Sequence, residues 1–149
     1  DVKADGSEEE PVFPLYVCEK DGEKYYIVPL RGKGLWGPIW GNMSFEGDFN
    51  TVYGVTLGHK GETPGLGAEI STIPFQEQFY GKKIFDNDMV FTSIQVVKGG
   101  IANLSEAKQI HGVDAVSGGT ITSDGVTDML FDILSIYMPY FEKQMKSPA

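Results

Sequence analysis

The residues best suited to chemistry form a glycine-centred, hydroxyl-rich turn at residues 114–123, Asp-Ala-Val-Ser-Gly-Gly-Thr-Ile-Thr-Ser. A helical pattern follows it, and the first four N–H groups of a helix lack intrahelical acceptors while the helix dipole adds partial positive charge there. Such a helix end binds phosphate groups. Thr122 or Ser123 is suited to cap the helix, which would leave the hydroxyl of Thr120 outside the cap. The turn therefore predicts an anchor for a phosphate-bearing cofactor.

Two other interpretations of this turn remain open. The first is an ordinary helix entrance with two glycines for a tight bend. The second is a hydrolase with Ser117 as nucleophile, His111 or His59 as base and Asp114 in support. The hydrolase interpretation is disfavoured, because a nucleophile elbow requires a glycine two residues before the serine and this chain has none there. The Gly118-Gly119 pair also lacks the lysine of a P-loop, so a single phosphate diester is favoured over a mobile di- or triphosphate.

Two earlier stretches could line a ligand site. Residues 58–67 are too rich in glycine and proline for a regular element, which predicts a loop of defined shape. There Glu62 and Thr63 place an acceptor and a hydroxyl beside Pro64, a suitable lining for a planar polar ring, although a plain connection is the alternative. Residues 31–41 carry Trp36 and Trp40, for which burial in the core is favoured over ligand stacking.

Composition excludes several classes of function. The chain has 149 residues and a formal net charge of −9, without a cluster of Lys and Arg, which argues against nucleic acid or an anionic membrane surface as partner. Its lone Cys18 cannot form an intrachain disulfide. His59 and His111 are the only histidines, and with one cysteine they do not make a metal cluster.

The N-terminal half predicts an antiparallel meander. Residues 1–11 are expected to be a disordered acidic leader, and residues 12–149 a single domain. Asp21-Gly22 lies between two runs rich in strand-forming residues, 15–17 and 25–28, which predicts a hairpin. A strand to about Phe45 and a returning strand over residues 51–57 follow.

The C-terminal half predicts helices. We expect a short helix from about Pro74, a strand over Met89–Val97, one or two helical turns over Leu104–Ile110, and a long helix after the 114–123 turn. Pro139 is expected to kink or end that helix. Because strands come first and helices follow, the fold class is α+β, an antiparallel sheet with helices packed on it.

Three motifs in this order closely resemble the C subunit of the sodium-translocating NADH:quinone reductases. They are Gly-Lys-Gly-Leu-Trp-Gly at residues 32–37, His-Lys-Gly-Glu-Thr-Pro-Gly-Leu-Gly at 59–67 and Ser-Gly-Gly-Thr-Ile-Thr-Ser at 117–123. The resemblance extends over essentially the whole chain after the leader. It implies an FMN-binding domain, related also to the G subunit of the Rnf electron-transport complex.

In that family FMN is esterified through its phosphate to a threonine of an Asp-x-x-Ser/Thr-Gly-Ala-Thr motif. Here Thr120 is the residue that the resemblance assigns as phosphothreonyl-FMN, and Gly119 stands where the family usually has alanine. The resemblance further implies that the residues around the cofactor are Asp114, Ser117, Gly118, Gly119, Ile121 and Thr122 on the phosphate and ribityl side, and Glu62, Thr63, Gly65, Leu66 and, as a weaker candidate, Trp36 on the ring side.

The resemblance also implies a role and a location. The domain would pass electrons between redox centres of a membrane-bound, sodium-translocating NADH:quinone oxidoreductase, without turnover by itself. A separate flavin transferase, using FAD and a divalent metal, would attach the FMN. An N-terminal transmembrane helix, absent from this sequence, would hold the domain on the outer face of the bacterial inner membrane. The alternatives are a non-covalent binding module for a phosphorylated small molecule, the equivalent Rnf protein, or a component with a purely structural role.

Overall fold

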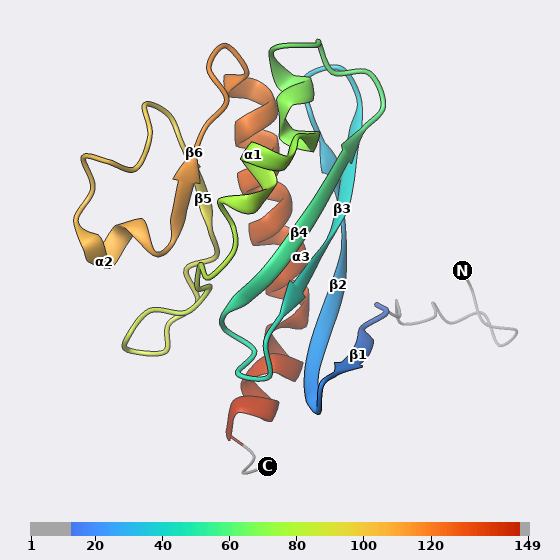
Figure 1. The fold of residues 1–149 in the computed structure, drawn as a ribbon, viewed down its shortest axis with the longest axis vertical. Helices are drawn as coiled ribbons and strands as arrows, with labels where there is room; N and C mark the ends of the chain where they lie inside the picture. The colour runs from blue at the N-terminus through green and yellow to red at the C-terminus, as the bar shows by residue number, and fades with distance from the viewer. Residues whose placement is uncertain (1–12, 147–149) are drawn as a thin grey trace, which may run out of the picture.

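The computed structural model describes residues 13–146, so the expected leader lies outside the described residues. Four antiparallel strands form the main sheet in the order β1-β2-β3-β4, and a long C-terminal helix lies against it (Figure 1). The α+β prediction is confirmed. The elements are β1 (Tyr16–Lys20), β2 (Glu23–Lys33), β3 (Pro38–Phe45), β4 (Val52–His59), the 3₁₀ helix η1 (Gly67–Ser71), α1 (Ile73–Glu77), β5 (Gln95–Val97), α2 (Glu106–Gln109), β6 (Gly112–Asp114) and α3 (Thr120–Lys146).

The hairpin between β1 and β2 has the predicted two-residue turn. Lys20 pairs with Glu23, and the two residues between them, Asp21 and Gly22, have φ angles of 53° and 82°. Positive φ at both central residues is the requirement of a type I′ turn, whose twist matches that of the flanking strands. The Asp-Gly pair therefore sets the register at the start of the sheet.

The core lies between the sheet and α3. Alternate residues of β3, among them Ile39, Met43 and Phe45, are buried, as expected for a strand with one face on a core. Phe45 meets Phe141 of α3 edge to face, with ring centroids 5.3 Å apart and an interplanar angle of 81°. This packing fixes α3 along the sheet. The first turn of α3 therefore lies at the end of the sheet where a turn connects β2 to β3.

The helix does not end at Pro139, contrary to one of the expected outcomes, and it runs on to Lys146. An interior proline costs a backbone hydrogen bond and about 3 kcal/mol. Met138 and Phe141, on either side of it, are both buried, and their packing against the core offsets that cost. Within residues 13–146, no helix is apolar enough over a sufficient length to cross a membrane.

The prediction of one strand over Met89–Val97 is wrong for most of its length. Only β5 is a strand, and it pairs in parallel with β6, which the sequence pattern did not reveal. Met89 and Ser93 have φ angles of 61° and 56°, a conformation that interrupts an extended chain. The short β5-β6 sheet packs beside α3, where the Val96 N–H donates to the Thr127 hydroxyl over 2.9 Å.

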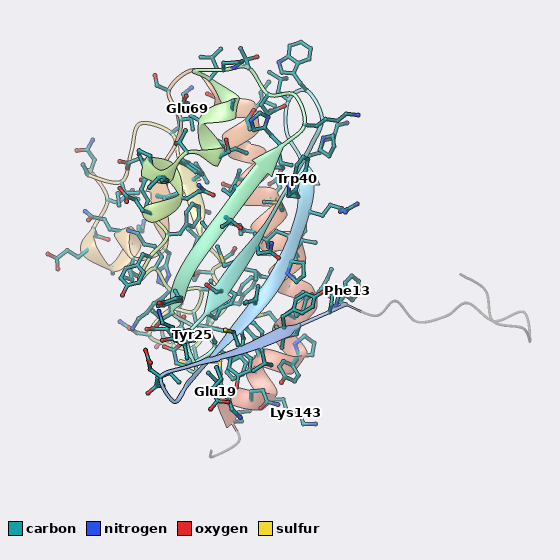
Figure 2. All side chains as sticks on the ribbon, turned by 45° about the vertical axis from the view of Figure 1, so that its right-hand side comes forward. Phe13, Glu19, Tyr25, Trp40, Glu69 and Lys143 are labelled. Carbon is teal, nitrogen blue, oxygen red and sulfur yellow. The ribbon has the colours of Figure 1, made fainter. Side chains whose placement is uncertain are left out.

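The two edges of the main sheet are covered differently. All five residues of β1 are exposed. At the other edge the Leu57 N–H of β4 donates to the Gln76 side-chain oxygen of α1 over 2.6 Å, and the Val52 N–H donates to the Lys82 carbonyl over 2.8 Å. In Figure 2, Glu19 of β1 and Trp40 of β3 lie toward opposite ends of the sheet.

Candidate functional site

The first turn of α3 begins earlier than predicted, at Thr120. Ser123 N–H donates to the Gly119 carbonyl over 2.9 Å, so the N–H groups of the three residues before Ser123 precede the helical ladder. Thr122 or Ser123 was expected to cap the helix, but both residues lie inside it and are only 2% and 1% exposed. Gly119 directly precedes the helix, and it has no side chain that could accept from the N–H groups of the first helical turn.

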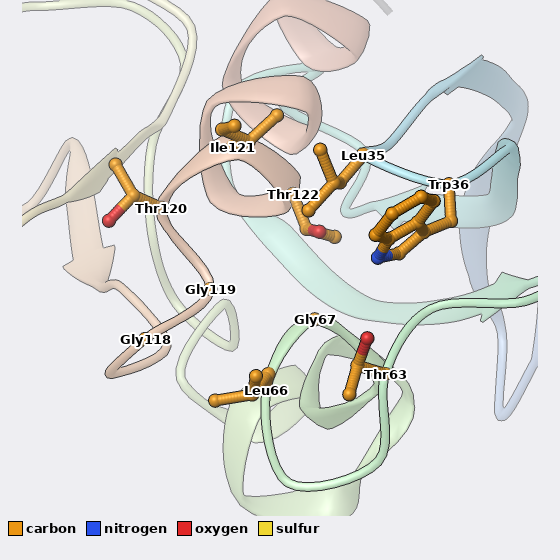
Figure 3. Close-up of a pocket in the computed structure, with 10 residues that line it drawn as sticks. All are labelled: Leu35, Trp36, Thr63, Leu66, Gly67, Gly118, Gly119, Thr120, Ile121 and Thr122. Carbon is orange, nitrogen blue, oxygen red and sulfur yellow. The ribbon is translucent and has the colours of Figure 1, made fainter.

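A cavity of about 210 Å³ opens at this helix start. Three segments form its walls: the turn between β2 and β3, the loop after β4, and the first turn of α3 (Figure 3). Its lining residues are Leu35, Trp36, Thr63, Leu66, Gly67, Gly118, Gly119, Thr120, Ile121 and Thr122. The fold therefore brings together eight of the twelve residues predicted for the site, one of them from the first motif, two from the second and five from the third.

The apolar side chains of the cavity wall are exposed. Trp36 is 68% exposed, and Leu35, Leu66 and Ile121 also lie at the surface. The expected burial of the tryptophans is wrong, since Trp40 is also 43% exposed. Trp36 lies in a turn closed by the Gly34 N–H to Gly37 carbonyl bond, outside any strand that could turn it inward. Exposed apolar groups around a concave site are suited to a planar aromatic ligand.

Thr120 lies between this cavity and a second one of about 460 Å³. Figure 3 shows Thr120 on one side of the helix start and Leu35, Trp36 and Thr122 on the other. The second cavity contains the predicted residues Asp114 and Ser117, together with Lys98. Its other lining residues are Gly99, Gly100, Ala115, Val116 and Gly118.

Two predicted residues, Asp114 and Gly65, lie outside the first cavity. Asp114 is not in the first cavity, and its Oδ1 accepts from the Ile101 N–H over 2.8 Å, which holds the turn after β5. Gly65 lines neither cavity, but its φ of 77° lets the loop after β4 turn. Both residues shape segments that carry lining residues.

Glu62 lies behind the cavity wall and is 4% exposed. Its Oε1 accepts from the Leu35 N–H over 2.9 Å and from the Thr122 hydroxyl over 2.5 Å, and its Oε2 accepts from the Trp36 N–H over 2.8 Å. The carboxylate therefore connects all three segments of the wall.

These contacts keep Glu62 ionised. Burial raises the pKa of its carboxyl group, but hydrogen bonds from the Thr122 hydroxyl and from the N–H groups of Trp36 and Leu35, with a smaller contribution from His59, lower it by more. The pKa therefore lies below the ordinary glutamate value. A buried carboxylate with several donors is stable as the anion.

Glycines allow the segments to come close together. A Cβ at Gly34 would lie 2.5 Å from Glu62 Oε1, and one at Gly67 would overlap the Thr122 hydroxyl. Gly118 has a φ of 75°, and a Cβ there would lie 2.7 Å from Leu66 Cδ2. At Gly119 the nearest atom to a Cβ would be Val116 Cγ1, at 3.2 Å. Only the last position has nearly enough room for a side chain.

Neither histidine completes a hydrolase arrangement with Ser117. His59 Nδ1 accepts from the Glu62 N–H over 3.1 Å, and His111 Nδ1 lies 2.6 Å from the Lys83 carbonyl oxygen. Both rings thus contact backbone groups of their own neighbourhoods.

Sequence reasoning missed two residues of the first cavity, Leu35 and Gly67, and the lysine of the second, Lys98. Leu35 and Gly67 lie within the motifs already singled out, and their positions next to Trp36 and Leu66 could have identified them. Lys98 has no such signal, because it reaches the site only through the β5-β6 pairing.

Comparison with known proteins points to one family. A model of the FMN-binding domain matches residues 34–135. The C subunit of the Na(+)-translocating NADH-quinone reductase of Chlamydia pneumoniae is 41% identical over 121 residues, covering 74% of this chain and 38% of the relative. The corresponding protein of Vibrio alginolyticus is 44% identical over 110 residues, covering 74% and 41%. The chain thus spans about two fifths of the length of these relatives.

Solved structures agree with this match. The crystal structure of the C subunit from Parabacteroides distasonis aligns with a TM-score of 0.80 and 47% identity, covering 92% of this chain and 64% of that one. NqrC from Shewanella oneidensis aligns with a TM-score of 0.77 and 35% identity, covering 89% and 61%. The likeness therefore extends over most of the fold, including the sheet and the long helix that form the core.

Proposed function

Because the chain belongs to the family of FMN-binding domains, we propose that it is the FMN-carrying part of the C subunit of a sodium-translocating NADH:quinone reductase. Its work in the complex is to accept electrons from one redox centre and pass them to another. When bound, FMN supplies the reversible electron chemistry, and the protein supplies position and electrostatics.

The observation that carries this proposal is the position of Thr120 at an uncapped helix start between two cavities. The residues on the two sides fit the two ends of FMN. The free N–H groups of the first turn suit a phosphate, and Lys98 in the second cavity supplies a positive charge that the turn itself lacks. The exposed apolar groups Leu35, Trp36 and Leu66 suit the flat ring system.

We assign the covalent attachment to the hydroxyl of Thr120. In the expected reaction its oxygen forms a bond to the FMN phosphorus of FAD, the bond to AMP breaks, and AMP leaves with the hydroxyl proton transferred to solvent or to the transferase. A separate flavin transferase with a divalent metal performs this step. Ser117, Gly118 and Gly119 give the phosphate a turn without bulky side chains.

An ester bond has a physical advantage at this site. The cavity walls are exposed, so a flavin held by contacts alone would exchange with solvent. Attachment at Thr120 removes dissociation and leaves the walls to orient the ring. A domain on the outer face of the membrane, anchored by a helix outside the present sequence and bound to the rest of the complex, needs such retention.

Intact-mass measurement after coexpression with a flavin transferase tests the proposal. The expected result is a mass increase equal to FMN less water, with flavin absorbance that remains on the chain in denaturant. Flavin that separates on denaturation would instead support the non-covalent binding module. The same preparation made without the transferase serves as the control and is expected to lack the adduct.

A further inference from the structure

We propose that Glu62 is a positioning residue, whose carboxylate fixes the Leu35–Trp36 wall of the cavity to the first turn of α3. The connection itself is a property of the apoprotein. Its consequence for the cofactor rests on the proposed function: the ring-binding wall is held at a set distance from the attachment residue Thr120.

The first support is the set of partners. Both carboxylate oxygens are used, and the donors come from two segments far apart in sequence, with separations of 27, 26 and 60 residues from Glu62. Hydrogen bonds to an ionised acceptor are stronger than those between neutral groups. Because the carboxylate is buried, water competes weakly for these donors.

The second support is that Glu62 itself is held firmly. Its N–H donates to His59 Nδ1 over 3.1 Å. The loop that follows closes on the Thr63 carbonyl, which accepts from the N–H groups of Leu66 and Ala68 over 3.0 and 3.1 Å. The wall is therefore tied to a rigid loop.

The third support is that the wall residues are exposed, whereas Glu62 is buried. Leu35 and Trp36 are 47% and 68% exposed, so apolar packing contributes little to holding them. Their N–H groups reach Glu62 because Gly34 has no side chain to fill the intervening space. The two backbone hydrogen bonds thus supply the restraint that packing does not.

Replacement of Glu62 by glutamine discriminates sharply between a positioning role and simple space filling. The amide has the same shape but one acceptor oxygen. If that oxygen keeps Leu35 and Thr122, the NH₂ group faces the Trp36 N–H, donor against donor. The wall is therefore expected to separate from the helix at Trp36, although the volume is unchanged.

The test uses the apoprotein with Trp40→Phe, so that Trp36 is the only tryptophan. Glu62→Gln is expected to lower the fluorescence anisotropy of Trp36 and to increase its quenching by acrylamide. Thr122→Val, which removes the donor from α3, is a second variant with the same expected direction. Glu69→Gln, in η1, is the matched control and is expected to leave both signals unchanged. Unchanged Trp36 signals in both test variants would overturn the proposal.

The holoprotein separates this inference from the proposed function. Glu62→Gln is expected to keep the FMN mass adduct while the visible circular dichroism of the flavin and its reduction potential shift. A wild-type chain that takes up no FMN would refute the proposed function and leave the Trp36 result standing. A variant with the wild-type dichroism and potential would refute the role of Glu62 toward the cofactor.

Discussion

The hydroxyl of Thr122 donates to the carboxylate of Glu62 over 2.5 Å, across 60 residues of sequence. This bond lies in the interior, between the loop after β4 and the first turn of the long helix. It joins the second and third sequence motifs, which also come close together at Gly67 and Gly119. The two motifs therefore act as one structural unit.

The first prediction concerns acid. The pKa of Glu62 is lowered on folding, so its contribution to stability is present above the ordinary carboxyl pKa of about 4.3 and is lost as the pH falls through the lower folded value. Glu62→Gln is expected to reduce the free energy of unfolding at pH 7 by roughly 1.5–3 kcal/mol, the range for a hydrogen bond to a charged group. Urea denaturation should show this difference shrinking below pH 4, while Glu69→Gln shows none. A difference that stays constant with pH would contradict the assignment.

The second prediction concerns the attachment residue. Thr120→Val is expected to abolish the FMN adduct because it removes the only reacting oxygen of the side chain, while Thr120→Ser retains it. Thr63→Val, which also alters a lining hydroxyl, is the control that should keep the adduct. Intact mass and in-gel flavin fluorescence measure both outcomes. An adduct that survives in Thr120→Val would move the assignment to another residue.

The third prediction compares two adjacent glycines. Gly118→Ala combines a positive φ with a contact to Leu66 and is expected to cost about 1–3 kcal/mol and to reduce flavin attachment. At Gly119→Ala the new Cβ would lie 3.2 Å from Val116 Cγ1 and 3.3 Å from the backbone of Leu66 and Gly67, so shifts of a few tenths of an ångström suffice. The substitution also introduces the alanine that the resemblance implies. Its expected effect is below about 1 kcal/mol, with attachment retained. Equal losses of stability and of flavin attachment in both variants would contradict this conformation of the turn.

The motifs in the sequence were sufficient to predict eight of the ten residues that line the first cavity, because each motif is a short local signal. Glycines mark turns, and hydroxyl groups before a helical pattern mark a helix start. The position of Glu62 behind the wall could not be predicted in this way. It depends on the distance between Leu35, Trp36 and Thr122, which only the packing of α3 on the sheet determines.

The fold was predicted well where the local pattern was strong, as in the Asp21-Gly22 hairpin. It was predicted poorly where tertiary contacts prevail. The helix starts at Thr120, earlier than predicted. The Thr122 hydroxyl donates to Glu62 and therefore does not cap the helix. The parallel β5-β6 pair has only three residues in each strand, too few for a periodic pattern.

The fourth prediction concerns the exposed ring. Trp36→Ala is expected to change the free energy of unfolding by less than about 0.5 kcal/mol, because the side chain is 68% exposed. The flavin fluorescence of the holoprotein should increase, since an aromatic ring next to a flavin quenches it. Trp40→Ala is the control, because Trp40 lies outside the cavity lining. Flavin fluorescence unaffected by Trp36→Ala would exclude a contact between the two rings.

The unequal edges of the main sheet determine how neighbouring chains can approach the domain. A strand with free N–H and C=O groups is a place where another chain can add to a sheet. At β4 that place is taken by α1 and by residues 81–82, whereas β1 is fully exposed. β1 pairs only with residues 23–27 of β2, and the cavity wall follows the far end of that strand. Within residues 13–146, growth of the main sheet by a neighbouring chain is therefore confined to the edge at β1, which lies away from the cavity.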